Sequence, residues 1–437
     1  MSDPVKSFYV GAPYQMSLPK VVTGVAGGII TPANIAHHVI ARRDIDKKYP
    51  HLRNRLLDPQ LYLAELNAAS CRKTCSNLAS YGWFPLTEAL PFDSGTTTQQ
   101  EWSATVKAKI ETIWTGRTPA TAEEIEIAVR LCVEAQVALG VEAIILPSPL
   151  TQDPTSTYAV ELEWLERGEK IAAILAPHLQ TLATVAISDV ALRGTDAWSN
   201  RLLDVILDQL TSRGLSGAYI VPVMASEEAY YYTHPRTVGG LLRVCNGLRA
   251  GGARRVVVNF AGTAGLMCLA AGADTWASGW YRSQRRMRLS DYEGEGGRVF
   301  PAFYSHPLGG EFHMEHDLDR VVAAGFLPRV HDSTPTSSGL MRALSTGQKV
   351  DNVAAWRHTS GNRTASTEHF LLASARETAG LASLSEVEAI DKVKGWLEVA
   401  YRISSDLQAA GPFNARTALK HQHGWLSAFN EFATNRY

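Results

Sequence analysis

The segment from His306 to Asp317 holds three histidines and three carboxylates within twelve residues. Imidazole and carboxylate groups this close together could bind a metal ion or move protons. The His-Glu-x-x-His spacing with which a helix presents zinc ligands does not occur here, so we expect no bound metal. We predict instead that His306 is a proton-transfer or hydrogen-bonding group near an active site, and that residues 315–319 form the acidic first turn of a helix. A lyase or metal-assisted hydrolase centred on His306, Glu311 and His313 stays open as an alternative.

The densest positive segment of the chain, Arg282–Arg288, contains four arginines and follows directly on Trp280 and Tyr281. Guanidinium groups beside aromatic rings suit phosphate binding and base stacking. The segment therefore predicts a contact with a nucleotide or with a nucleic-acid backbone. The alternative is a solvated loop, or one whose charges pair with the three acidic residues between positions 291 and 295.

Composition and charge restrict the partners of the chain. The 437 residues contain 42 Lys and Arg against 43 Asp and Glu, so no overall field draws the chain to nucleic acid or to an anionic membrane. No run of the ~18 to 20 apolar residues needed for a membrane helix occurs, and the first residues have no apolar signal core. The five cysteines are too scattered for a disulfide framework. We therefore expect a cytoplasmic protein without membrane contact.

From about residue 120 the sequence alternates between amphipathic runs of helical length and short runs of Val, Ile and Ala, which is typical of βα repeats. Residues 122–140 predict a helix that ends at a glycine, and residues 143–147 predict a strand that is buried on both faces. The same cycle predicts further helices at 158–176, 197–213, 236–250 and 266–271, and further strands at 182–188, 217–223, 255–260, 273–278 and 299–304.

Upstream, residues 21–25 and 61–63 are expected as the first strands, and residues 68–80 as a helix with Cys71 and Cys75 on one buried face. A parallel sheet of eight or nine strands either opens into a doubly wound sheet or closes into a barrel. The glycines between positions 24 and 28 lack the spacing of a dinucleotide-binding turn. We therefore predict an α/β fold: a (β/α)8 TIM-type barrel over residues 1–330 and a C-terminal helical extension over residues 331–437, with helical patterns at 368–380, 385–407 and 417–432.

In such a barrel the reacting groups follow the C-terminal ends of the strands, because those ends meet at one mouth. Asp189 closes an apolar strand, where desolvation would prepare a carboxyl group for acid or base catalysis; capping of the helix expected near Asp196 is the alternative. The three tyrosines at 230–232 could line a pocket for a planar ligand; a half-buried helix face or an oligomer contact is the alternative. The other polar candidates at strand ends are Ser148, Gln152, Asp153, Glu227, Glu228, Asn259, Thr263, Ser278, Trp280, Tyr281, Arg282, Ser305 and His306.

Residues 259–278 and the arginines after them resemble the last barrel segment of the tRNA-guanine transglycosylase superfamily. The shared features are a Gly262-Thr263 turn, a helix, a Gly272-x-Asp274 step at the start of a strand, and an arginine-rich loop. Members of that family are TIM barrels that exchange a guanine-type base for a 7-deazaguanine through a covalent intermediate on one Asp, with a second Asp as acid and base. The resemblance implies a pocket for a purine-like base. With the strand-end positions, the expected substrate contacts are Ser148, Asp153, Asn259, Gly262, Thr263, Trp280, Tyr281, Arg282 and Arg285.

Two departures from the family pattern bear on the chemistry. Ala277 stands where the family has its nucleophilic Asp, and no cysteine follows Cys268 to form the family's zinc site. The resemblance implies that Asp189 hydrogen-bonds the edge of the base. It also implies that Ser278 or Asp274 lies near the point of attack on the sugar.

These observations predict a transglycosylase-like transferase that binds a 7-deazaguanine or another purine-like base. We expect a nucleic acid, a protein or another anionic molecule as acceptor, no cofactor, and assembly into homo-oligomers. The predicted catalytic residues are Asp189, Asp274, Ser278 and His306. The alternatives are the lyase or hydrolase named above, and a non-catalytic barrel that binds a base or a protein and assembles through its helical extension.

Overall fold

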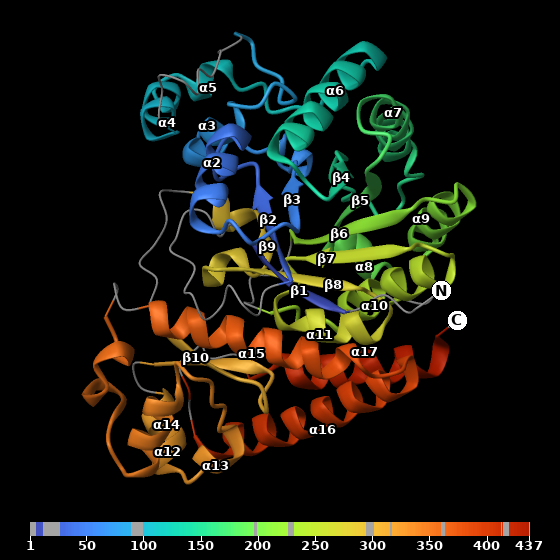
Figure 1. Ribbon diagram of the computed structural model, residues 1–437. Helices are drawn as coiled ribbons and strands as arrows, with labels where there is room; N and C mark the ends of the chain where they lie inside the picture. Colours follow the sequence, from blue (N-terminus) through green and yellow to red (C-terminus); the bar gives the residue numbers. More distant parts are fainter. Residues whose placement is uncertain are drawn as a thin grey trace.

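The computed structural model describes residues 6–11, 27–88, 99–195, 199–225, 231–293, 301–314, 317–359, 363–411, 413 and 419–436 (Figure 1). Eight parallel strands lie in the spatial order β3, β2, β1, β8, β7, β6, β5, β4. Their bounds are β1 (Ser7–Gly11), β2 (Gly28–Pro32), β3 (Arg55–Asp58), β4 (Ala143–Leu146), β5 (Gln180–Ser188), β6 (Gly217–Met224), β7 (Arg255–Asn259) and β8 (Thr275–Gly279). The two end strands meet, since the amide of Glu142, just before β4, donates to the carbonyl of Arg55 at 3.0 Å. The sheet is a nearly closed TIM-type barrel, which confirms the predicted fold class.

Helices cover the outside of this barrel. They are α2 (His38–Lys48), α3 (Arg72–Leu78), α4 (Gln99–Lys107), α5 (Ile110–Ile113), α6 (Ala122–Leu139), α7 (Ala159–Leu175), α8 (Asp189–Arg193), α9 (Arg201–Ser212), α10 (Pro235–Ala250) and α11 (Gly265–Ala270). Local sequence sets their ends: α6 begins at a reciprocal Thr121–Glu124 capping box and ends at Gly140, whose φ of 76° suits a glycine. The predicted cycle of helices and strands between residues 122 and 278 is confirmed, with ends shifted by a few residues.

Two of the predictions outside that cycle need correction: residues 61–63 are not a strand, and the strand predicted at 299–304 does not belong to the barrel. Residues 61–63 form a 3-10 helix, η2 (Leu61–Leu63); the strand of this region is β3, which ends before Pro59, a residue without an amide hydrogen for the ladder. Residues near 299–304 do contain a strand, β10 (Ala302–Ser305), but it pairs antiparallel with β11 (Gly310–His313) outside the barrel. The prediction for residues 21–25 lies outside the described residues, and β1 and β2 are not among the predicted strands.

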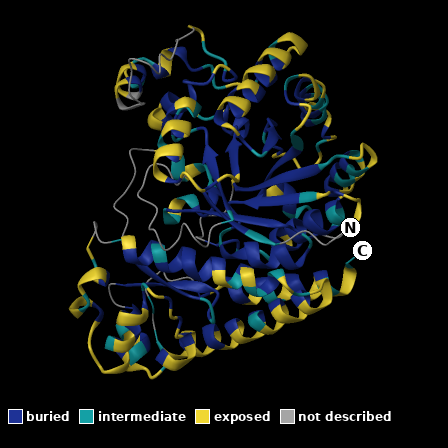
Figure 2. Ribbon diagram, viewed as in Figure 1, coloured by how far each residue is buried: buried dark blue, intermediate teal, exposed yellow. Residues whose placement is uncertain are grey.

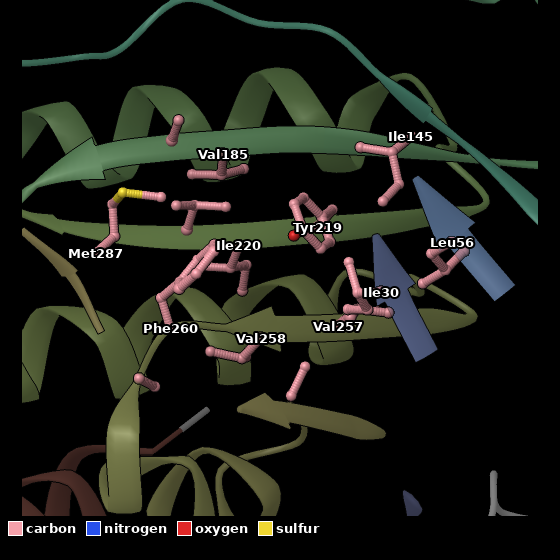
Figure 3. Close-up of a cluster of buried hydrophobic side chains, with 14 of the residues drawn as sticks. Ile30, Leu56, Ile145, Val185, Tyr219, Ile220, Val257, Val258, Phe260 and Met287 are labelled. Carbon is pink, nitrogen blue, oxygen red and sulfur yellow. The ribbon is translucent and has the colours of Figure 1, made fainter. Parts of the chain in front are cut away.

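Alternate residues of each strand point into the barrel. Parallel pairing sets Tyr219 of β6 beside Val257 of β7, and Ile30 of β2 beside Leu56 of β3. Figure 3 shows the Tyr219 ring in the middle of these side chains, together with Ile145 of β4. Because apolar packing fills the middle of the barrel, polar chemistry is confined to its two ends.

The C-terminal region packs along one side of the barrel (Figure 1). It contains the β10–β11 hairpin, α12 (Asp317–Ala323), α13 (Leu327–Val330), α14 (Ser338–Ser345), α15 (Thr364–Ala382), α16 (Glu386–Ala410) and α17 (His421–Asn435). Helix α15 lies against β1 and adds Phe370 to the barrel core, while a second core forms around Phe303, Phe312 and Trp356. Exposed residues lie along the outer side of α16, whereas the barrel strands are buried (Figure 2). The predicted C-terminal helical region is confirmed. None of the helices in the described ranges combines the length and the apolarity needed to cross a membrane.

Candidate functional site

The chain after β8 folds back over the C-terminal end of the barrel. Arg286 forms an antiparallel bridge with Ala261, which follows β7. The short strand β9 (Met287–Arg288) then pairs with Val223 and Met224 at the end of β6, and the 3-10 helix η5 (Leu289–Tyr292) follows. Residues 280–292, here called the mouth segment, therefore cover the C-terminal mouth of the barrel.

A fully buried carboxyl group lies at this mouth. Oδ2 of Asp58, the last residue of β3, accepts hydrogen bonds from the hydroxyls of Tyr62 at 2.6 Å and Tyr219 at 2.9 Å. Its Oδ1 accepts a hydrogen bond from the Gln60 amide at 3.1 Å. Burial raises the pKa of Asp58 to about 6, and the hydrogen bonds oppose this rise because they favour the ionised form. Asp58 can therefore give up and take back a proton near neutral pH.

Tyr219 connects Asp58 to the neighbouring strand β7. The side-chain amide of Asn259 donates to the Tyr219 hydroxyl oxygen at 2.7 Å, and its own oxygen accepts from the Phe260 amide at 2.9 Å. Phe260 has a φ of 61°, a left-handed conformation that a bulky side chain rarely adopts. Backbone strain of this kind concentrates at functional sites. We call Asp58, Tyr62, Tyr219 and Asn259 the mouth cluster.

The mouth segment reaches the mouth cluster through Tyr292. Burial and the nearby charge of Asp58 both raise the pKa of this tyrosine. Of the mouth cluster, only Asn259 is among the predicted site residues; Asp58 is not, because the strand that it ends is not among the predicted strands. The signal for Asp58 is the run Leu56-Leu57-Asp58-Pro59, an apolar pair closed by an acidic residue, which is the pattern that singles out Asp189.

The direction of side chains on β8 separates Ser278 from this site. Trp276 packs against Gly265 of α11, where any side chain would collide with the indole ring, so Trp276 faces the helical layer. Residues two apart on a strand face the same way, so Ser278 also faces outward. It is fully buried, and its hydroxyl has no hydrogen-bond partner among the described residues. The inward position is Ala277, which pairs with Asn259.

Asp189 lies at the rim of the mouth, in the first turn of α8. Its Oδ1 accepts a hydrogen bond from the Ala225 amide at 2.9 Å, and Oδ2 lies 3.5 Å from the Arg193 guanidinium. Ser188, and not Asp189, is the N-cap of α8, because its hydroxyl accepts the Ala191 amide hydrogen. The expected neighbours Asp196, Glu227, Glu228 and Tyr230 lie outside the described residues.

The arginines of the mouth segment divide into two ion-paired groups. Arg286 and Arg288 pair with Asp291, one of the acidic residues that the sequence analysis considered. Arg282 and Arg285 pair with Glu311 of β11, and the Arg282 to Glu311 distance is 2.9 Å. Burial would raise the pKa of Glu311, but the charges of Arg285 and Arg282 outweigh it and lower the pKa. Glu311 is therefore an ionised, buried carboxylate.

Further binding candidates lie in the loop after β7 and at the start of the mouth segment. Gly262, with a φ of 55°, donates its amide hydrogen to the Arg285 carbonyl at 2.7 Å. Thr263 is buried, and its hydroxyl has no hydrogen-bond partner in the described part of the chain. Trp280 is buried, whereas the half-buried Tyr281 ring lies under the Arg363 guanidinium, 4.6 Å from the ring centroid.

His306 lies in the C-terminal region, and not at the barrel mouth where the sequence analysis expects it, because β10 belongs to the hairpin. Its Nε2 is 3.1 Å from the Glu377 carboxylate, and its ring stacks on Trp396 with centroids 5.2 Å apart. Burial lowers the pKa of His306, although the carboxylates of Glu377 and Asp332 oppose this. The structure therefore does not bring together Asp189, Ser278 and His306.

Asp274 lies at the opposite end of the barrel, just before β8. It accepts the Val256 amide hydrogen at 2.7 Å and pairs with Arg249, while burial raises its pKa. It lines a hollow of about 800 Å³ that the starts of the strands surround. Reactions in TIM barrels take place at the other end, so this position favours a structural role for Asp274.

The two candidates after β4 make only local contacts. Ser148 is buried, and its hydroxyl donates to the Pro149 carbonyl at 3.4 Å. Asp153 is exposed and accepts hydrogen bonds from the hydroxyl and the amide of Thr155, both at 2.7 Å, which lower its pKa. Asp153 therefore stabilises its own turn.

The histidine-rich segment does not assemble metal ligands in the part of it that is described. Among the described residues of the whole chain, no group of three or more His, Cys, Asp or Glu side chains is arranged to hold a metal ion. Glu311 is taken up by two guanidinium groups, and His316 and Glu315 lie outside the described residues.

Comparison with known proteins adds no family to this picture. No protein-family model matches the sequence, and no curated protein is similar enough to count as a relative. The fold defines the class, an α/β TIM-type barrel with a C-terminal helical region.

Proposed function

We propose that the protein is a transglycosylase-like transferase that binds a purine-like base, such as a 7-deazaguanine, at the C-terminal mouth of its barrel. The observation that carries the proposal is Asp58: a fully buried carboxyl group at a strand end, with a pKa near 6 and two tyrosine hydroxyls on one oxygen. An enzyme that exchanges bases needs a group that protonates the departing base and deprotonates the incoming one. A carboxyl group with this pKa serves both steps near neutral pH.

The surroundings of Asp58 support recognition of a flat, polar ring. Asn259 offers an amide group at the end of β7, and Asp189 offers a buried carboxylate at the rim that suits the N–H groups of a base edge. The ligand would lie between these groups and the mouth segment, with Tyr292 beside Asp58. These are the donor and acceptor types that distinguish a purine-like ring from an apolar one.

Ala277 defines the chemical route that we propose. A covalent intermediate on this strand would need a carboxylate at the inward position, and alanine has none. We therefore propose an exchange without a covalent enzyme intermediate. The bond between the sugar carbon and the departing nitrogen breaks as protonated Asp58 gives its proton to the departing base, which leaves an oxocarbenium ion. The incoming base takes the vacated place, its nitrogen bonds to the same carbon, and the Asp58 carboxylate takes the proton that this base loses.

The test is incorporation of an isotope-labelled 7-deazaguanine or guanine into a guanosine-containing acceptor, with mass spectrometry of small molecules released from the purified protein. We expect a purine-like molecule in the released fraction and exchange by the wild type. Asp58→Asn should slow exchange by about 100-fold or more, the usual effect of losing an acid–base group, and Asp189→Asn should weaken base binding. A released flavin or sugar phosphate, or full activity of Asp58→Asn, would contradict the proposal.

Ala277 also favours a second candidate, a barrel that binds the base without exchanging it. In that case the labelled base binds at the mouth with the same dependence on Asp58 and Asp189. It never enters any acceptor.

A further inference from the structure

A pair of arginines beside the mouth, the buried Arg285 and the half-buried Arg282, holds a carboxylate in the way that proteins hold phosphate. Arg282 and Arg285 each contact a different oxygen of Glu311, and Glu311 and Arg285 are both less than 5% exposed. Two guanidinium groups converging on a planar anion give the geometry used for carboxylate and phosphate recognition. Because two positive groups share one negative group, the three side chains together carry one positive charge.

A small cavity lies next to this pair, and two of the residues that line it carry a buried polar group without a partner among the described residues. It is lined by Gly262, Thr263, Arg285, Glu311 and Phe370, among others, and has room for about one water molecule, about 10 Å³. The Thr263 hydroxyl and the Arg285 Nε have no hydrogen-bond partner among the described residues, although both residues are buried. Buried donors left without acceptors destabilise a fold, so they are expected where a ligand supplies the acceptor.

The position of these groups in the fold independently favours a phosphate site. TIM barrels often bind the phosphate group of a substrate with the loops after their seventh and eighth strands. Here Gly262 and Thr263 follow β7, and Arg282 and Arg285 follow β8. Space remains beside Gly262, because a Cβ atom there would come no closer than 3.8 Å to its nearest neighbour, the Arg285 carbonyl oxygen.

We propose that Arg282, Arg285 and Thr263 form a subsite for a phosphate monoester on the substrate, and that the Glu311 carboxylate occupies this subsite when the ligand is absent. This inference rests on the proposed function and makes the acceptor, whose base is exchanged, a nucleotide or another phosphorylated nucleoside. A phosphate dianion that displaces the carboxylate adds the negative charge that balances both arginines. Because Arg285 is only 4% exposed, the subsite suits a terminal phosphate better than a nucleic-acid backbone.

Isothermal titration of the full chain with inorganic phosphate and with guanosine 5′-monophosphate tests the subsite. Glu311→Gln removes the competing charge, so we expect phosphate to bind about tenfold more tightly. Arg285→Lys keeps the charge but loses the planar fork, and should weaken binding at least tenfold. Thr263→Val removes one donor at constant shape and should weaken binding severalfold. Glu142→Gln, which alters a Glu–Arg pair at the other end of the barrel, is the matched control and should bind phosphate as the wild type does.

A purely structural role for Glu311 makes the opposite prediction, since Glu311→Gln would then lower thermal stability without tightening phosphate binding. That result, or equal phosphate binding by Arg285→Lys and the wild type, would overturn the subsite. If Glu311→Gln does not fold, Thr263→Val decides, because unchanged phosphate binding by that variant contradicts the proposal. Tighter binding of an oligonucleotide without a terminal phosphate than of the monophosphate would also overturn it. Phosphate binding that survives Asp58→Asn, together with no binding of any base, would retain the subsite and reject the proposed function.

Discussion

The two ends of the barrel contain the same chemical pair, a carboxylate and a tyrosine hydroxyl, in opposite electrostatic surroundings. At the N-terminal end, Glu142 accepts a hydrogen bond from Tyr9 at 2.7 Å and pairs with Arg255 at 2.7 Å, and water reaches both charged groups. At the mouth, Asp58 accepts hydrogen bonds from two tyrosines and is fully buried, and no cation within the described ranges pairs with it.

This difference assigns a stabilising role to Glu142 and a functional role to Asp58. Glu142 is partly hydrated and paired with Arg255, so it links the starts of strands at little cost in desolvation. A buried carboxyl group without a cation destabilises the fold whenever it is ionised, so its presence needs another reason. Perturbed acids in such positions concentrate at active sites. The contrast therefore favours the mouth, and not the larger hollow at the N-terminal end, as the functional site.

The largest expected effect concerns the pH dependence of stability at Asp58. Its pKa is raised in the folded state from an ordinary value of 3.8 to about 6, so folding favours the protonated form. This contribution is complete below pH ~4 and is lost as the pH rises through 6. At ~1.4 kcal/mol per pKa unit, the loss is about 3 kcal/mol. The unfolding free energy of Asp58→Asn should not fall in this way between pH 4 and pH 8. Urea denaturation of the wild type and the variant over this pH range measures the difference. If the unfolding free energies of both proteins changed in parallel with pH, the buried-acid interpretation would be contradicted.

A smaller effect is expected at the other end of the barrel. Glu142→Gln leaves Arg255 without its partner, and because both groups are about one-fifth exposed, we expect a loss of about 1 to 2 kcal/mol in unfolding free energy. The loss should be the same at pH 6 and pH 8, and binding at the mouth should not change. A Glu142→Gln variant that loses ligand binding would show that the two ends are not separate.

The smallest effect is expected at Ser278. Its hydroxyl faces the helical layer and is buried without a partner among the described residues. Ser278→Ala should therefore change the unfolding free energy by less than about 1 kcal/mol, with a gain more expected than a loss. Ligand binding and exchange should be as in the wild type. A tenfold or larger loss of exchange activity would show that Ser278 belongs to the active site and would contradict this prediction.

The sequence predicts the fold better than the site, for reasons that particular residues illustrate. Strands such as β4 and β6 are recognisable because burial on both faces makes them unbroken apolar runs between helices. The strands β1 to β3 each contain only two or three consecutive apolar residues, whereas all four residues of β4 are apolar, so the pattern of β1 to β3 is weak. Because β3 is not predicted, Asp58 is not recognised as a residue at a strand end.

The composition of the site depends on geometry that no local pattern contains. Strand ends identify Ser278 and Asn259 equally well, but only the register of β7 and β8 shows that Asn259 faces inward and Ser278 outward. In the same way, β10 looks like a barrel strand, and only its pairing with β11 takes His306 away from the mouth. Glu311 of the hairpin pairs with Arg282 and Arg285 of the mouth segment, and their spacing in the sequence does not reveal this contact.

The most direct test of the central claim is calorimetric titration of 7-deazaguanine into the wild type, Asp58→Asn and Glu142→Gln at pH 7. The mouth site predicts that the wild type and Glu142→Gln bind the base with equal affinity, and that Asp58→Asn binds at least tenfold more weakly. Equal binding by Asp58→Asn and the wild type, or loss of binding in Glu142→Gln alone, would contradict it.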